Sequence, residues 1–150
     1  MIKIFLLTAF FCLFTFSCTN ELDKRIEKVS YGTSFGECMG YCKHQMVITV
    51  DSAKYSCISN GNTLPQKDVY EKMTTNRWDS IRNNMTFSSL LALPEVIGCP
   101  DCADGGAEWL ELMLTNGETH KVTFEYGKEP ASIKDYIAKC RLILNKNSCQ

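Results

Sequence analysis

The sequence predicts an α+β domain in which a single antiparallel sheet of about five or six strands has two helical segments packed on one face. Segments of alternating apolar and polar residues separated by turn residues indicate the strands. Two later segments with apolar residues at helical spacing indicate the helices. The chain has 150 residues, 45% hydrophobic and 22% charged, which suits one globular domain. A formal net charge of −1 gives no basic region of the kind that binds nucleic acid.

The opening residues are expected to lie outside this fold. Lys3 precedes an apolar run over residues 4–16, which is too short to span a bilayer as a helix but suits the apolar segment of a signal peptide. We therefore expect residues 1–17 to be a signal peptide that directs the chain out of the cytosol.

A lipid-attachment motif follows the apolar run. Thr15-Phe16-Ser17-Cys18 resembles the lipobox of bacterial lipoproteins, in which the cysteine is lipidated and becomes the mature N-terminus. Phe16 stands where a small residue is usual, and an ordinary secretory signal that ends near a cysteine is the alternative. We expect Cys18 to carry the lipid, residues 18–24 to form a tether, and residues 25–150 to form one domain held at the membrane by acyl chains.

The first half of the domain is predicted to form short strands. Residues 44–50 (His-Gln-Met-Val-Ile-Thr-Val) are rich in β-branched side chains, which pack well on a pleated surface. Asp51-Ser52-Ala53-Lys54 is expected to form the turn into the next strand. The strands expected in this half are residues 25–31, 44–50, 55–59 and 66–73.

A helical period replaces the strand period after residue 74. Thr75 is expected to cap a helix, because a threonine hydroxyl accepts a hydrogen bond from a backbone N–H of the first turn. A second helical piece ends before Pro94, since the residue preceding a proline disfavours the helical conformation. The apolar side of these pieces comprises Trp78, Ile81, Met85, Phe87, Leu90 and Leu91.

The C-terminal part is predicted to form a hairpin and a last helix. Residues 109–115 alternate in polarity, and Asn116-Gly117 is the strongest hairpin turn in the chain. Apolar residues alternate again on the return strand, at Val122, Phe124 and Tyr126. The last helix begins at Ser132, and its apolar stripe comprises Ile133, Ile137, Cys140 and Leu144.

A Cys-x-Gly-x-Cys motif lies between the first two strands, as Cys38-Met39-Gly40-Tyr41-Cys42. With this motif and the order of its elements over about residues 25–145, the chain resembles a family of small exported bacterial lipoproteins that carry a domain of unknown function. In that family a turn of this kind leads into a strand hairpin. The resemblance implies no activity, cofactor or catalytic residue.

Export determines how the remaining cysteines are interpreted. Disulfides persist in oxidising compartments such as the periplasm, so a cysteine pair is expected to form a bridge there. An odd number of cysteines follows Cys18, so at least one stays free or pairs with another molecule. These cysteines are Cys38, Cys42, Cys57, Cys99, Cys102, Cys140 and Cys149.

Three interpretations of the cysteines remain open. Cys38 and Cys42, and Cys99 and Cys102, can form bridges within each turn or across the two turns, and Cys140 can pair with Cys149 if the tail folds back. The four cysteines of the two turns can instead form a tetrahedral zinc site. Cys99-Pro100-Asp101-Cys102 also resembles a thiol–disulfide active site, although the residues after it do not favour a helix.

Together these features predict a protein of the bacterial cell envelope, lipid-anchored on the periplasmic side or the outer surface. Its domain is expected to be a non-catalytic binding or structural module stabilised by disulfides, without a cofactor and without catalytic residues. Its expected contacts are the membrane, through the lipid, and a protein or small molecule that the sequence does not identify. The alternative is a thiol–disulfide or zinc-binding protein centred on Cys99 and Cys102.

Overall fold

The computed structural model describes residues 25–84 and 87–147. The predicted signal peptide over residues 1–17, the lipidation site Cys18 and the tether over residues 18–24 lie outside these residues. Within the described part of the chain, no helix has both the length and the apolar character needed to cross a membrane.

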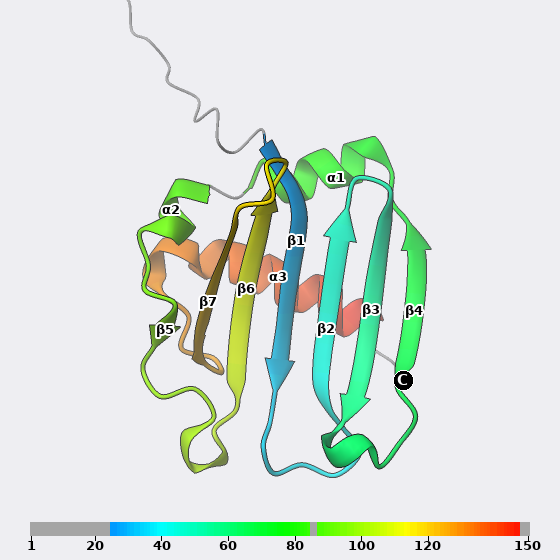
Figure 1. The fold of residues 1–150 in the computed structure, drawn as a ribbon, viewed down its shortest axis with the longest axis vertical. Helices are drawn as coiled ribbons and strands as arrows, with labels where there is room; N and C mark the ends of the chain where they lie inside the picture. The colour runs from blue at the N-terminus through cyan, green and yellow to red at the C-terminus, as the bar shows by residue number, and fades with distance from the viewer. Residues whose placement is uncertain (1–24, 85–86, 148–150) are drawn as a thin grey trace, which may run out of the picture.

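The domain is α+β, with one sheet of seven strands in the order β4-β3-β2-β1-β6-β7-β5 (Figure 1). The α+β class and the single sheet are confirmed, and the predicted number of strands is slightly too low. The strands are β1 (Ile26–Ser34), β2 (Tyr41–Thr49), β3 (Ser52–Ser59), β4 (Lys67–Lys72), β5 (Val96–Ile97), β6 (Ala107–Leu114) and β7 (Thr119–Glu125).

The sheet is mixed rather than antiparallel, because β5 pairs in parallel with β7. Val96 lies beside Thr123 and Ile97 beside Phe124 in this pairing. β5 was not predicted, because a strand of two residues is too short to show alternation. β5 extends the sheet beyond β7 and forms its edge.

The β2–β3 hairpin is tighter than predicted. Ile48 pairs with Ala53, so Ser52 already belongs to β3 and the predicted turn over residues 51–54 is wrong in its position. The hydroxyl of Thr49 accepts a hydrogen bond from the backbone N–H of Ser52 at 3.2 Å, which stabilises the shorter turn.

β1 forms the centre of the sheet between strands that are distant in the sequence. It pairs with β2 on one side and with β6 on the other, where Ser34 lies beside Ala107. This arrangement brings the loop after β1 to the same end of the sheet as the loop before β6 (Figure 1). Each of these two loops contains one of the cysteine turns.

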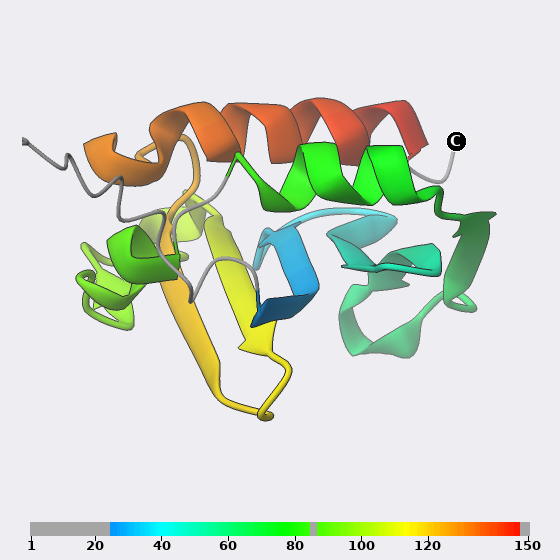
Figure 2. The ribbon, with the colours of Figure 1, turned by 90° about the horizontal axis from the view of Figure 1, so that it is seen from above.

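The helices α1 (Thr75–Arg82) and α3 (Lys134–Asn147) lie side by side over one face of the sheet (Figure 2). The short helix α2 (Phe87–Leu91) contacts β7. The cap of α1 is Thr74 instead of Thr75, since the Thr74 side chain accepts from the backbone N–H of Arg77. The described residues thus contain three α-helices, one more than the two predicted helical segments.

The hydrophobic core lies between this face of the sheet and the helices. The predicted alternation in β6 is confirmed, because Leu110, Leu112 and Leu114 are all fully buried. Ile137 and Leu144 of α3 belong to the same core cluster, as the predicted helical stripe requires. No helix of residues 25–84 and 87–147 lies over the opposite face of the sheet, which is called the open face below (Figure 2).

Candidate functional site

Each cysteine turn closes on itself. Cys38 and Cys42 are at disulfide distance with their Cα atoms 5.6 Å apart, and Cys99 and Cys102 with theirs 5.4 Å apart. The structure therefore selects bridges within each turn over bridges across the two turns. Loops this short remove little chain entropy, so each bridge is expected to stabilise the fold by about 2 kcal/mol.

The two turns nevertheless meet at one end of the sheet. The backbone N–H of Gly36 donates to Oδ1 of Asp101 at 3.0 Å, which joins the loop after β1 to the second cysteine turn. The Asn60 side chain donates to the carbonyl of Gly36 at 2.6 Å. Among residues 25–84 and 87–147, no three His, Cys, Asp or Glu side chains are grouped so as to hold a metal ion. The zinc site stays a prediction.

The second cysteine turn has an unusual backbone. Asp101, Ala103 and Asp104 have positive φ angles of 62°, 49° and 59°, a region that side-chain-bearing residues seldom adopt. Residues Cys102–Asp104 of this turn form a short 3-10 element, and the chain then enters β6. Cys99 therefore does not begin an α-helix, which is the element that lowers the thiol pKa in thioredoxin-like sites. Both sulfur-bearing residues are exposed.

Cys140 does not form the bridge for which it was a candidate. It is a free thiol, only 2% exposed, on the face of α3 that packs against the core. Burial, helped by the nearby Glu108 carboxylate, raises the pKa of this thiol well above its usual value, so the thiol stays protonated. Its predicted partner Cys149 lies outside the described residues, and Cys57 is disulfide-bonded.

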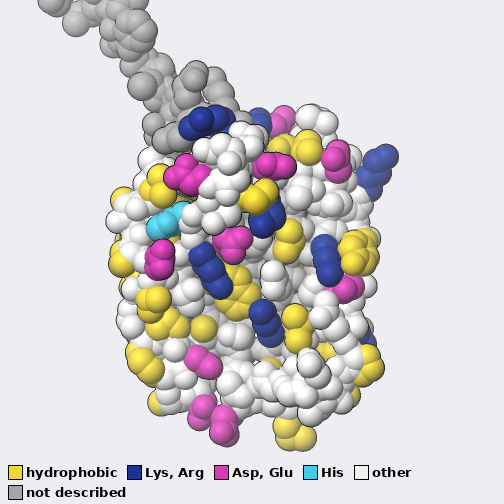
Figure 3. Space-filling view, in the orientation of Figure 1, with side chains coloured by type: hydrophobic (Ala, Val, Ile, Leu, Met, Phe, Trp, Pro, Cys, Tyr) yellow, Lys and Arg dark blue, Asp and Glu magenta, His cyan; other side chains and the backbone are white. Residues whose placement is uncertain are grey.

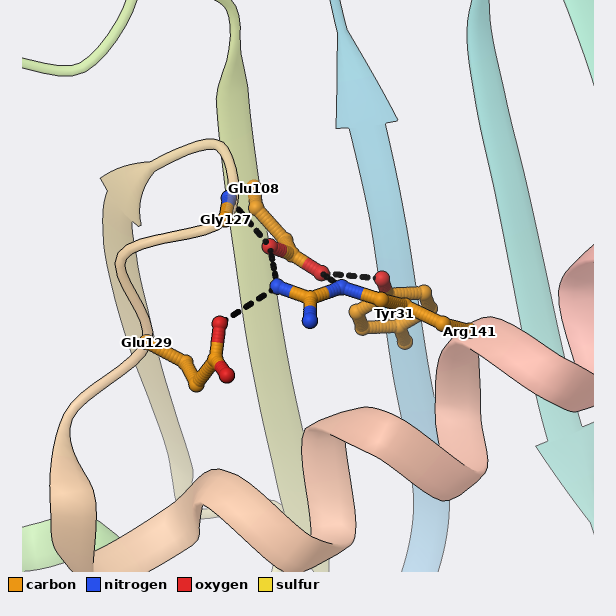
Figure 4. Close-up of polar contacts among 5 residues, drawn as sticks. All are labelled: Tyr31, Glu108, Gly127, Glu129 and Arg141. Atoms are coloured by element: carbon orange, nitrogen blue, oxygen red, sulfur yellow. Dashed lines mark hydrogen bonds and ion pairs between the residues drawn. The ribbon is translucent and has the colours of Figure 1, made fainter.

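A buried ionic cluster joins α3 to the sheet (Figure 4). Glu108 of β6 is fully buried. Arg141 of α3 donates two hydrogen bonds to its carboxylate, from Nε to Oε1 at 2.8 Å and from Nη2 to Oε2 at 2.6 Å. The Tyr31 hydroxyl of β1 donates to Oε1, and the backbone N–H of Gly127 donates to Oε2 at 3.3 Å. Arg141 also bonds Oε2 of Glu129 at 2.6 Å. We call these five residues the Glu108 cluster.

The hydrogen bonds of the Glu108 cluster determine its electrostatics. Burial and the bond to Glu108 raise the pKa of Tyr31, so its hydroxyl remains a donor. Hydrogen bonding to Arg141 lowers the pKa of Glu129 and keeps that carboxylate charged. Because both oxygens of Glu108 accept hydrogen bonds, with Arg141 of α3 among the donors, the cluster fastens α3 to the sheet.

The sequence contained a signal for this cluster that our predictions did not use. Glu108 precedes Leu110, Leu112 and Leu114 by even numbers of residues, and in a strand such residues share a face. A carboxylate in register with core leucines needs hydrogen-bond donors or a cation to offset its burial. The spacing alone could not identify Arg141 as that cation, because the two residues are 33 positions apart.

The open face carries a tryptophan held between two lysines. The Lys43 and Lys121 ammonium nitrogens each lie 5.2 Å from the ring centroid of Trp109, a cation–π distance. The indole crosses β1 over Gly32, where a Cβ atom would overlap the ring. Gly32 is therefore required for the ring to lie flat against the sheet. We call Lys43, Trp109 and Lys121 the open-face cluster.

The lysines of the open face are not all neutralised. Lys28 pairs with Glu111 at 3.5 Å, and Lys54 pairs with Asp68 at 3.0 Å. Lys43 and Lys121, in contrast, form no ion pair with any residue in the described ranges. Figure 3 shows this face, with basic side chains spread among apolar and acidic ones across its middle. Neither lysine of the open-face cluster forms an ion pair within the described residues, although Glu111, which pairs with Lys28, lies beside Lys121 across β6 and β7.

Comparison with known proteins identifies no relative, since no protein-family model matches the chain and no curated protein is significantly similar to it.

Proposed function

We propose that the chain is an exported, lipid-anchored protein of the bacterial cell envelope, and that its disulfide-stabilised domain is a non-catalytic binding module. Its contact surface is the open face of the sheet, and its partner is a protein with an acidic surface. The observation that carries this proposal is the open-face cluster, in which Lys43 and Lys121 flank Trp109 and form no ion pair within the described residues.

The leader and the cysteines support the cellular location. Cys18 follows an apolar run that is typical of a lipoprotein signal peptide. Two local cysteine pairs at disulfide distance suit an oxidising compartment, where they persist. An acyl anchor at Cys18 would leave the whole domain available for contacts in the envelope.

The state of the charged groups supports binding over catalysis. The buried carboxylate of Glu108 is fully occupied by Arg141, Tyr31 and Gly127. Lys43 and Lys121, which form no ion pair within the described residues, lie instead on a broad sheet surface, and catalytic and small-molecule sites are usually concave. Two lysines that form no ion pair on a flat surface are complementary to acidic groups of a partner protein and accelerate its association.

Poly-glutamate serves as the probe for this surface. We expect the wild-type domain to bind it with an affinity that falls as salt rises, because the interaction is electrostatic. The double variant Lys43→Glu/Lys121→Glu is expected to abolish binding, as measured by biolayer interferometry. The matched control Lys134→Glu/Lys146→Glu makes the same change of charge on α3. Equal loss of binding in the two double variants would refute a role for the open face.

The anchor is tested separately. Cys18→Ser is expected to move the protein from the membrane fraction to the soluble envelope fraction when it is expressed in a bacterium. Cys12→Ser, within the apolar run, is the control and is expected to leave the protein in the membrane fraction. Retention of Cys18→Ser in the membrane fraction would refute lipidation at this position.

The alternative function is a thiol–disulfide or zinc centre at Cys99 and Cys102, which the exposure of both residues favours. Under this alternative, the reduced domain binds one zinc ion, and Cys99→Ser/Cys102→Ser abolishes that binding. Under the binding proposal, the same double variant retains binding of poly-glutamate. The two measurements separate the two functions.

A further inference from the structure

A groove is lined by residues of α1 and α3 and by Asn84. These two helices lie on the side of the sheet opposite to the open face (Figure 2). Its volume is about 290 Å³, which at roughly 30 Å³ for each non-hydrogen atom holds about ten such atoms. Its lining comprises Ser80, Ile81, Asn84, Tyr136, Lys139, Cys140, Leu142 and Ile143.

The groove is apolar inside and polar at its rim. Ile81 and the Cys140 thiol are buried, and Leu142 beside them is 72% exposed. At the rim, Lys139 reaches across from α3 and bonds Oδ1 of Asn84 at 2.6 Å. Such a lining suits a ligand with an apolar body and one polar end.

Tyr136 provides a second and independent indication of a ligand. Its side chain is 5% exposed, and its hydroxyl has no hydrogen-bond partner within the described ranges. Buried hydroxyls in proteins nearly always have a partner. Tyr136 lies one helical turn before Lys139, so both residues lie on the side of α3 that lines the groove.

We propose that this groove binds a medium-chain monocarboxylic acid. The alkyl chain packs between Ile81 and Ile143 along the apolar interior. The carboxylate accepts a hydrogen bond from the Tyr136 hydroxyl on its inner side and replaces Asn84 as the acceptor for Lys139 on its outer side. The charge of Lys139 selects an anion, and the volume of the groove selects a chain of about eight carbons.

Octanoate is the probe, and 1-octanol, which has the same chain without the charge, is the comparison ligand. Binding is measured by titration calorimetry and mapped by amide chemical shifts. We expect octanoate to bind more tightly than 1-octanol and to shift amides of α1 and α3. Lys139→Ala is expected to weaken octanoate binding by about tenfold, as loss of a hydrogen bond to a charged group predicts. Lys134→Ala, an exposed lysine on the same helix, is the control.

Tyr136→Phe separates binding from folding. Because the hydroxyl has no partner, its removal is expected to leave the thermal midpoint unchanged or to raise it, while octanoate binding becomes weaker.

Ser80→Trp, at an exposed position on the rim, is expected to block the groove without disturbing the core. Three results would each overturn the proposal: no octanoate binding, equal affinities in Lys139→Ala and Lys134→Ala, or amide shifts confined to the open face.

Discussion

The two faces of the sheet differ in how far their charged side chains form ion pairs. On the face beneath the helices, Glu108 is fully buried and Arg141 neutralises it with two hydrogen bonds. On the open face, Lys43 and Lys121 lie against Trp109 and form no ion pair within the described part of the chain. A buried charge must be paired, since its desolvation is costly, whereas water screens an exposed one. The ion pair under the helices is therefore structural, whereas under the proposed function Lys43 and Lys121 of the open face meet a partner.

Among the variants that test this difference between the faces, Arg141→Met should lower the free energy of unfolding the most. Arg141→Met leaves the Glu108 carboxylate buried without its cation, and we expect the free energy of unfolding to fall by about 3–5 kcal/mol. Urea denaturation followed by circular dichroism measures the change. The double variant Glu108→Leu/Arg141→Met should recover much of the loss, because no buried charge remains. If the single and double variants were equally unstable, packing rather than charge would explain the role of Arg141.

Gly32 tests how the open face is built. Gly32→Ala places a methyl group where the Trp109 ring lies, and we expect a loss of about 1–3 kcal/mol in unfolding free energy together with a change in tryptophan fluorescence. Trp109→Leu in the same background should relieve the overlap and restore part of the stability. Gly40→Ala is not a suitable control, since Gly40 has a φ of 89°. An unchanged stability in Gly32→Ala would show that the ring does not lie over β1.

Acidification should lower the free energy of unfolding by protonating Glu129, which contacts Arg141 on the face beneath the helices. Hydrogen bonding to Arg141 lowers the pKa of this carboxylate in the folded state. Its contribution to stability is therefore present above its unfolded pKa and is lost as the pH falls through its folded pKa. We expect Glu129→Gln to be less stable than the wild type at neutral pH and to lose less stability on acidification. Urea titrations between pH 7 and roughly pH 3 measure both effects, spanning the ordinary carboxylate range.

A matched variant sharpens the Glu129 measurement. Glu27→Gln removes an exposed carboxylate of the same type from β1. A change in the pH profile as large as that of Glu129→Gln would mean that net charge, rather than the contact with Arg141, causes the effect.

The smallest effect is expected on the open face itself. Lys121→Ala removes one cation from the Trp109 ring, and we expect a loss of only about 0.5–1 kcal/mol in unfolding free energy. Tryptophan fluorescence should change at the same time, because the ring gains contact with solvent. A loss as large as that of Arg141→Met would contradict the distinction between the two faces.

The sequence by itself determined the local features of this protein. Alternation identified the inward leucines of β6, Asn116-Gly117 identified the hairpin turn, and helical spacing identified the buried stripe of α3. The short spacing within each cysteine pair made closure within the turn possible. These features depend on residues within a few positions of one another, and backbone geometry relates such residues directly to a shared face or turn.

Only the tertiary structure determined the partners across the fold. Tyr31 meets Glu108 across 77 positions, and Gly32 lies beneath Trp109 because β1 pairs with β6. The edge strand β5 and the groove between α1 and α3 also arise from long-range packing. Periodicity indicates which way a side chain points, but it does not specify the order of strands in the sheet. The strand order decides which charges are buried together and which remain on the open face.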